Sequence, residues 1–175
     1  MEQFYKQILK LIEAAEKPVF AVFDFDNTCI NGDIGEAVFF QAAKKQDIDL
    51  HKNLVAQGRQ READELASRA LTGLTVGEVN NITDKVLGPG QLKIKENVIG
   101  LLNFLRESGV TVWIVTASCE AVVMRAMKHF GIAAELIGVR NILKDGKLTS
   151  ELEHPAPWQK GKVDCIKKFI SKDKR

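Results

Sequence analysis

Residues 19–28 read Val19-Phe20-Ala21-Val22-Phe23-Asp24-Phe25-Asp26-Asn27-Thr28. The first five residues form a continuous apolar run, which is typical of a strand buried on both faces inside a parallel sheet. The run ends at Asp24, and a second carboxylate follows at Asp26. We therefore expect two acidic side chains to lie together where a buried strand ends. In open α/β sheets, this carboxyl edge is where ligands bind.

The rest of the chain alternates between predicted helices and strands. Apolar spacing before Pro18 indicates an amphipathic helix, and Asp145-Gly146 predicts a tight hairpin turn within residues 142–149. Strands are expected at 110–115 and 135–139, and helices at 98–108, 120–129 and 160–171. This alternation predicts an α/β fold with a right-handed parallel sheet.

The stretch from Gly32 to about Asn97 differs from the rest, because it is polar, helical in pattern and without a convincing strand. We interpret it as a small helical domain inserted after the first strand. The expected division is therefore a core of residues 1–31 and 98–175, with an insert of residues 32–97.

Composition argues against several classes of partner. The 175 residues include 25 basic and 23 acidic side chains, a net charge of +2, which favours neither nucleic acid nor an anionic membrane as the main partner. The three cysteines form no CxxC pair, and such low usage fits a reducing compartment. No apolar run approaches the ~20 residues that span a bilayer, and the N-terminus lacks the apolar core of a signal peptide. We expect a cytoplasmic location, while the oligomeric state stays open.

Asp24 and Asp26 suggest a metal-assisted reaction. Two neighbouring carboxylates repel each other unless a cation lies between them, and Mg²⁺ prefers carboxylate and water oxygens. One carboxylate can then act as a nucleophile while the other transfers the proton. A simpler interpretation is that both acids form a turn, since Asp and Asn are common turn residues.

The stretch from Phe23 to Thr28 resembles the first signature, DxDxT, of the haloacid dehalogenase-like (HAD) phosphatase superfamily. Thr116 matches the Ser/Thr of the second signature, and the segment Lys160-Gly161-Lys162-Val163 is similar to the third. The resemblance is strongest to the phosphoserine phosphatase-like branch, in which a helical C1-type cap is inserted after the first signature. Pro157-Trp158 looks more like the phosphorylcholine phosphatases of that branch. The resemblance to the superfamily implies a Rossmann-like core with a parallel sheet and a small cap.

The resemblance also implies roles for the residues that match the signatures. Asp24 would form an aspartyl phosphate, Asp26 would be the acid and base, and the Asp24 carboxylate with the Asp26 main-chain carbonyl would hold Mg²⁺. Either Lys160 or Lys162 would bind the phosphoryl group, and the two spacings leave this choice open. The remaining phosphate contacts would come from the amides and side chains of Phe25, Asn27, Thr28, Thr116, Ala117 and Ser118. Ser118 could instead cap the following helix.

The implied substrate is a small phosphorylated amino alcohol or amino acid, such as phosphoserine or phosphocholine. Asp33 would face the substrate amine and Arg69 a carboxylate, although Arg69 could equally be a solvated arginine. Trp158 could face a quaternary ammonium by cation–π attraction, but packing is the simpler expectation. Two alternatives remain: a phosphotransferase that uses the same aspartyl phosphate, and a non-catalytic module that binds a phosphorylated ligand.

The fourth signature of the superfamily has no match. It would supply a further acid to the Mg²⁺ site, whereas Asp164 and Asp173 lie within or after the last predicted helix. We therefore expect an incomplete, C-terminally truncated core, a fragment of a longer phosphatase, and low activity.

Overall fold

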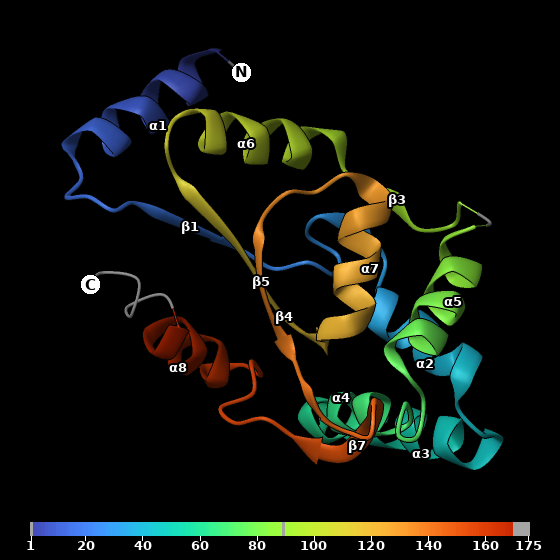
Figure 1. Cartoon of the computed structure of the whole chain (residues 1–175). Coiled ribbons are helices and arrows are strands. Elements are labelled where there is room, and N and C mark those ends of the chain that lie inside the picture. The colour runs from blue at the N-terminus through green and yellow to red at the C-terminus, as the bar shows by residue number, and fades with distance from the viewer. Residues whose placement is uncertain (1, 89, 170–175) are drawn as a thin grey trace.

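A three-stranded parallel sheet forms the centre of the protein in the computed structural model, which describes residues 2–88 and 90–169 (Figure 1). The strand order is β1-β4-β5, with β1 at Phe20–Phe23, β4 at Thr111–Cys119 and β5 at Glu135–Val139. Helices separate these strands along the chain, as parallel pairing requires. The predicted α/β fold with a parallel, Rossmann-like sheet is confirmed.

Helices cover both faces of the sheet. Val112 and Ile114 of β4 pack on the side of α6 (Glu96–Glu107) and α7 (Glu120–Phe130). The alternate residues Trp113 and Val115 point to the other side, where they form an apolar cluster with Cys165 of α8 (Lys160–Phe169). This alternation buries β4 on both faces. The first helix, α1 (Glu2–Ala14), lies beside α6, and the rings of Tyr5 and Phe104 are 4.4 Å apart.

The first strand departs from the expectation of burial on both faces. β1 pairs with β4 alone among the described residues, so it forms one edge of the sheet. Phe20 reaches the apolar cluster under α8, but Val22 on the same face is 41% exposed. The apolar run therefore predicted the strand correctly and its burial incorrectly, since an edge strand has a neighbour on one side only.

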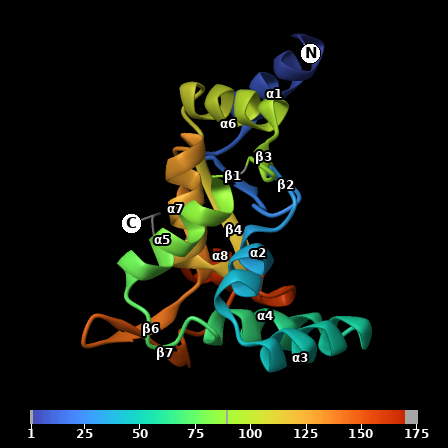
Figure 2. The ribbon, with the colours of Figure 1, turned by 90° about the vertical axis from the view of Figure 1, so that its right-hand side faces the viewer.

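The residues after β1 form a helical segment made of α2 (Ile34–Ala42), α3 (Lys45–Ala56), α4 (Gln60–Arg69) and α5 (Val76–Leu87). Figures 1 and 2 both place α3 and α4 at the opposite end of the molecule from α1 and α6. Two short strands that the sequence did not predict, β2 (Ile30–Asn31) and β3 (Lys93–Ile94), pair antiparallel where the segment begins and ends. They bring the two ends of the segment together.

The predicted hairpin is confirmed. β6 (Asn141–Lys144) and β7 (Lys147–Leu152) pair antiparallel across Asp145 and Gly146, whose φ values are 51° and 74°. Two consecutive positive φ angles give a tight turn that matches the strand twist. The hairpin reaches the helical segment, because the Leu148 N–H donates to the Leu74 carbonyl at 2.8 Å.

No helix within residues 2–88 and 90–169 combines the length and the apolar character needed to cross a membrane. The cytoplasmic location stays a prediction.

Candidate active site

Asp24 lies directly after β1 and is paired with a lysine. Its Oδ2 accepts a hydrogen bond from Nζ of Lys162 at 2.5 Å, and its Oδ1 accepts one from the Phe25 N–H at 2.9 Å. Lys162 is in the first turn of α8, far along the chain from Asp24. Lys160, two residues earlier, is exposed and does not reach Asp24. The structure thus distinguishes between the two lysines that the sequence left equivalent.

Asp26 is held by three hydrogen bonds. Its Oδ1 accepts from the Ile34 N–H at 2.8 Å, and its Oδ2 accepts from the hydroxyls of Thr116 at 3.2 Å and Ser118 at 2.7 Å. Burial, reinforced by the nearby charge of Asp33, raises the pKa of Asp26 to about 7. A carboxyl with that pKa can give or take a proton near neutral pH.

The turn after β1 explains how both aspartates reach one place. The side chain of Phe25 is fully buried and fixes the turn in the core, while Asn27 adopts a φ of 55° that Asn tolerates well. The amides expected to bind phosphate already have acceptors here. Phe25 N–H donates to Asp24, Asn27 N–H to the Gly32 carbonyl and Thr28 N–H to the Phe25 carbonyl. In this conformation these amides therefore hold the turn rather than point freely at a ligand.

Thr116, Ala117 and Ser118 lie within β4, not after it. The strand continues to Cys119 with a shift in register after Val115, so this part is irregular and turns its hydroxyls toward Asp26. Ser118 does not cap α7, because the N-cap residue is Cys119, which makes no side-chain cap. Gly35 of α2 packs closely here, and a Cβ on it would lie 2.3 Å from Oγ of Ser118. Glycine thus lets α2 approach the strand.

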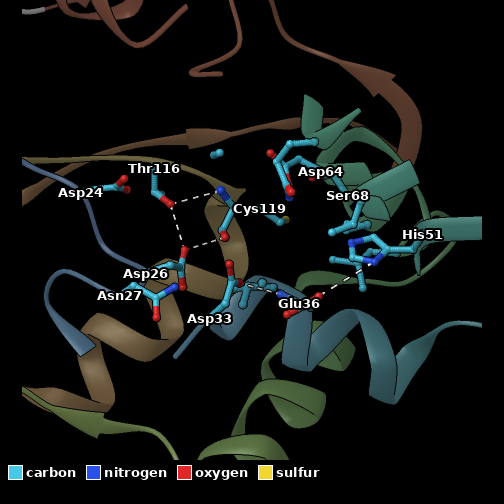
Figure 3. Close-up of a pocket in the computed structure, with 18 of the residues that line it drawn as sticks. Asp24, Asp26, Asn27, Asp33, Glu36, His51, Asp64, Ser68, Thr116 and Cys119 are labelled. Atoms are coloured by element: carbon cyan, nitrogen blue, oxygen red, sulfur yellow. Dashed lines mark hydrogen bonds and ion pairs between the residues drawn. The ribbon is translucent and has the colours of Figure 1, made fainter. Parts of the chain in front are cut away.

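These groups open into a cavity of about 470 Å³ (Figure 3). We call Asp24, Asp26, Thr116, Ser118 and Lys162 its strand end, and Glu36, His51 and Asp64 its helical end. Figure 3 shows Asp24, Asp26 and Thr116 on one side and Asp64, Ser68 and His51 on the other, with Asp33 and Glu36 between them. The lining includes Asp24, Asp26, Asn27, Asp33, Gly35, Glu36, His51, Val55, Gln60, Asp64, Ala67, Ser68, Leu71, Thr116, Ala117, Ser118, Cys119, Val122 and Lys162.

Several residues singled out from the sequence do not line this cavity. Arg69 has a half-exposed side chain that lies 3.5 Å from Glu65, so it pairs on the surface of α4. Thr28 and Phe25 belong to the turn behind the cavity. Trp158 is 6% exposed and packs with Val139 and Leu152, as the simpler expectation had it. Asp33 does line the cavity, and its Oδ1 caps α2 by accepting from the Glu36 N–H at 2.8 Å.

The sequence did not single out the residues of the helical end. His51 is 2% exposed on α3, and Asp64 accepts a hydrogen bond from Gln60 of α4 at 2.9 Å. Burial, with repulsion from Asp33 and Glu36, raises the pKa of Asp64 to about 6. A weak signal existed, since His51 shares a helix face with Leu54 and such a face is normally buried. Nothing in the sequence brings α2, α3 and α4 to one cavity.

The paired aspartates offer oxygen donors of the kind that Mg²⁺ binds. Within residues 2–88 and 90–169, no three or more His, Cys, Asp or Glu side chains are grouped to hold a metal ion. Mg²⁺ needs no such group, because it keeps several waters and commonly takes one or two carboxylates together with substrate phosphate oxygens. Asp24 and the main-chain carbonyl of Asp26 are hard oxygen donors that fit this pattern.

In this α/β fold, paired aspartates after β1 meet the hydroxyls of β4 and a lysine from the start of α8. The family model described as haloacid dehalogenase-like hydrolase matches residues 21–174. The chain therefore belongs to the haloacid dehalogenase-like hydrolase family, as its resemblance in sequence implied. No curated protein matched the sequence significantly.

Solved structures share the fold at low sequence identity. A HAD family hydrolase from Salmonella enterica serovar Typhi is 13% identical with a TM-score of 0.65, and the match covers 99% of this chain and 62% of that one. A protein of unknown function from Bordetella pertussis is 18% identical with a TM-score of 0.72, covering 88% and 74%. A substrate-bound phosphoserine phosphatase is 18% identical with a TM-score of 0.62, covering 91% and 74%. The chain thus spans between about three fifths and three quarters of the length of these relatives.

Proposed function

We propose that this chain is a Mg²⁺-dependent phosphomonoester hydrolase that works through an aspartyl phosphate on Asp24. The proposal rests on how the side chains are arranged at the strand end. There the Asp24 carboxylate lies 2.5 Å from Lys162, and the neighbouring Asp26 is held by the Thr116 and Ser118 hydroxyls. The substrate class is a small phosphorylated amino alcohol or amino acid.

In the first half of the reaction, a carboxylate oxygen of Asp24 attacks phosphorus. A bond forms between Asp24 and phosphorus, and the bond between phosphorus and the ester oxygen breaks. Asp26, protonated at this stage, gives its proton to the leaving oxygen, so the alcohol departs neutral. Its pKa of about 7 means that a sizeable fraction of Asp26 is protonated at neutral pH.

In the second half, Asp26 takes a proton from water, and that water attacks the aspartyl phosphate. The bond between Asp24 and phosphorus breaks, which releases inorganic phosphate and restores both carboxyl groups. The ammonium of Lys162 and the hydroxyl of Thr116, once it has released Asp26, hold the phosphoryl oxygens, because charge on these oxygens is the main obstacle in phosphoryl transfer.

Mg²⁺ would be held by the Asp24 carboxylate and the Asp26 main-chain carbonyl, and when bound it would neutralise further charge on the phosphoryl oxygens. Asp24 would then serve as both nucleophile and ligand.

We further propose that residues 32–97 are a cap domain on a core of residues 1–31 and 98–175. The cap proposal is supported by α2, α3 and α4, which supply the side of the cavity opposite the strands. Residues that choose the substrate would then come mainly from this segment. The phosphoserine phosphatase with a similar structure shares the fold of this chain, and its substrate is consistent with the proposed class.

The proposal is tested with Asp24→Asn. Phosphate release from a panel of phosphomonoesters with Mg²⁺ should fall by on the order of 10⁴-fold or more, because the nucleophile is lost while the shape is kept. The matched control is Asp145→Asn, in an exposed turn where Asn also tolerates positive φ, and it should retain activity. Beryllium fluoride with Mg²⁺, which mimics the phosphorylated carboxylate, should raise the Tm of the natural chain but not of Asp24→Asn.

Other outcomes point to different functions. Phosphate found on an added alcohol instead of in solution would make the chain a phosphotransferase. A rise in Tm with beryllium fluoride but no turnover of any phosphomonoester would favour a module that binds phosphorylated ligands. Equal activity in Asp24→Asn and the natural chain would rule out the aspartyl phosphate.

A further inference from the structure

The helical end of the cavity contains a buried polar atom that pairs with none of the described residues. The side chain of His51 is 3% exposed and lies against Phe39, with ring centroids 4.8 Å apart. Its Nδ1 has no hydrogen-bond partner among the described residues, and the nearest carboxylate oxygen, Oε1 of Glu36, is 4.0 Å away. Leaving such an atom unpaired is unfavourable, and His51 lines the cavity, so a donor group that enters beside it would remove this cost.

The charges around His51 indicate which charge a ligand group at this end should have. Asp33, Glu36 and Asp64 line the same cavity, while Lys162 is the single lysine or arginine among its described lining residues and is engaged with Asp24. Because the acids outnumber the cations, the helical end favours a positively charged group. The carboxylates accept hydrogen bonds, as does an imidazole nitrogen that carries no proton, which favours a cation with several N–H donors.

Two related ligand groups fit this end poorly. A carboxylate would meet like charges, and Arg69, the residue that could have bound it, pairs with Glu65 outside the cavity. A quaternary ammonium has no N–H to donate and is usually bound by aromatic rings. Of the described residues that line the cavity, none is Phe, Tyr or Trp, and the Trp158 ring is covered by Arg61 at 5.2 Å.

We propose that Glu36, His51 and Asp64 form a subsite for the primary ammonium group of a short aminoalkyl phosphate. This inference rests on the proposed function, because the strand end must hold the phosphoryl group at the other end of the same molecule. The inference narrows the substrate class to phosphorylated primary amines that carry neither an N-trimethyl group nor a carboxylate. The helical segment thereby selects the leaving group, while the strand end carries out the chemistry.

The inference is tested by comparing kcat/KM for 2-aminoethyl phosphate with that for ethyl phosphate, choline phosphate and phosphoserine, all with Mg²⁺. Ethyl phosphate presents the same phosphoryl group without the amine. We expect 2-aminoethyl phosphate to exceed each of the others by at least about tenfold, since a hydrogen bond to a charged group contributes that much.

Three variants locate the subsite. Asp64→Asn removes a charge without changing size, and His51→Phe keeps a ring against Phe39 while removing the nitrogen. Both should reduce the ratio of aminoethyl to ethyl phosphate by several-fold. Glu62→Gln, on the exposed face of the same helix as Asp64, is the matched control and should leave the ratio unchanged.

Failure of this inference and failure of the proposed function give different results. Equal kcat/KM for 2-aminoethyl and ethyl phosphate, with both hydrolysed, would overturn the subsite and leave the phosphatase standing. If neither is hydrolysed, calorimetric binding of the two compounds to the natural chain decides the question. Tighter binding of the amine, weakened by Asp64→Asn, would support the subsite, and equal or absent binding would overturn it.

Discussion

At the strand end of the cavity, both carboxylate oxygens of Asp24 and of Asp26 accept hydrogen bonds. At the helical end, Nδ1 of the buried His51 is unpaired among the residues that the structure describes. The strand end is therefore organised before any ligand arrives, which keeps the reorganisation needed for phosphoryl transfer small. The helical end leaves polar groups for the ligand to satisfy. The contrast suggests that one end determines the reaction and the other determines which phosphate ester enters.

Among substitutions that leave Asp24 in place, the largest effect is expected from Lys162→Met, which removes the cation of the strand end. We expect kcat/KM to fall by about 10²–10³-fold for every phosphomonoester, since one preorganised charge partner of the reacting group is lost. The matched control is Lys160→Met, because Lys160 lies two residues earlier in the same helix and does not line the cavity. Steady-state assays of both variants measure the difference, and an equal loss in the two would contradict the assignment of Lys162.

A smaller loss is expected from Ser118→Ala. Ser118 donates one of three hydrogen bonds to Asp26, and the Thr116 hydroxyl and the Ile34 N–H remain. One such bond contributes about 1–1.5 kcal/mol, so kcat should fall by roughly tenfold, equally for amine and alkyl substrates. Ser150→Ala, on an exposed part of β7, is the control for activity and Tm. A change in substrate preference instead of rate would contradict the division between the two ends.

The smallest expected effect is a change with pH in the preference for 2-aminoethyl phosphate, which is set at the helical end. The pKa of Asp64 is about 6, so its carboxyl gains charge as pH rises from 5 to 7. Burial raises this pKa most and the charges of Asp33 and Glu36 add to it, while the hydrogen bond from Gln60 and the charge of Lys162 lower it. A primary ammonium stays charged over this range, so the preference for 2-aminoethyl phosphate over ethyl phosphate should rise a few-fold with pH.

Taking the ratio removes effects that both substrates share, including ionisation of the phosphate and of Asp26. Asp64→Asn should weaken the rise of this ratio between pH 5 and 7. A ratio that falls with rising pH, or that stays constant in the natural chain, would contradict a role for Asp64 in binding the amine.

The strand end was largely predictable because its members occur at the boundaries of strongly patterned elements. Asp24 and Asp26 follow an apolar run, Thr116 follows another, and Lys162 opens a helix. Where alternatives remained, packing decided between them. Lys160 and Lys162 have equivalent sequence contexts, but the position of α8 directs Lys162 to Asp24. Ser118 could have been a helix cap, yet the extension of β4 turns it toward Asp26 instead.

The helical end was not predictable, because its residues look ordinary in their own helices. Glu36, His51 and Asp64 come from three different helices, and each is a polar residue of the kind that usually faces solvent. Their meeting depends on how α2, α3 and α4 pack, including the close approach of α2 to β4 at Gly35.

By itself the sequence determined the parallel α/β sheet, the helical insertion after the first strand and the aspartates of the strand end, because these follow from local patterns of burial and turn formation. Tertiary structure alone decided which lysine pairs with Asp24, the exposure of β1 as an edge strand, and the acidic cavity wall around His51. These features depend on contacts between residues distant in the chain, and hydrophobic periodicity specifies which face of a helix is buried but not which neighbour it meets.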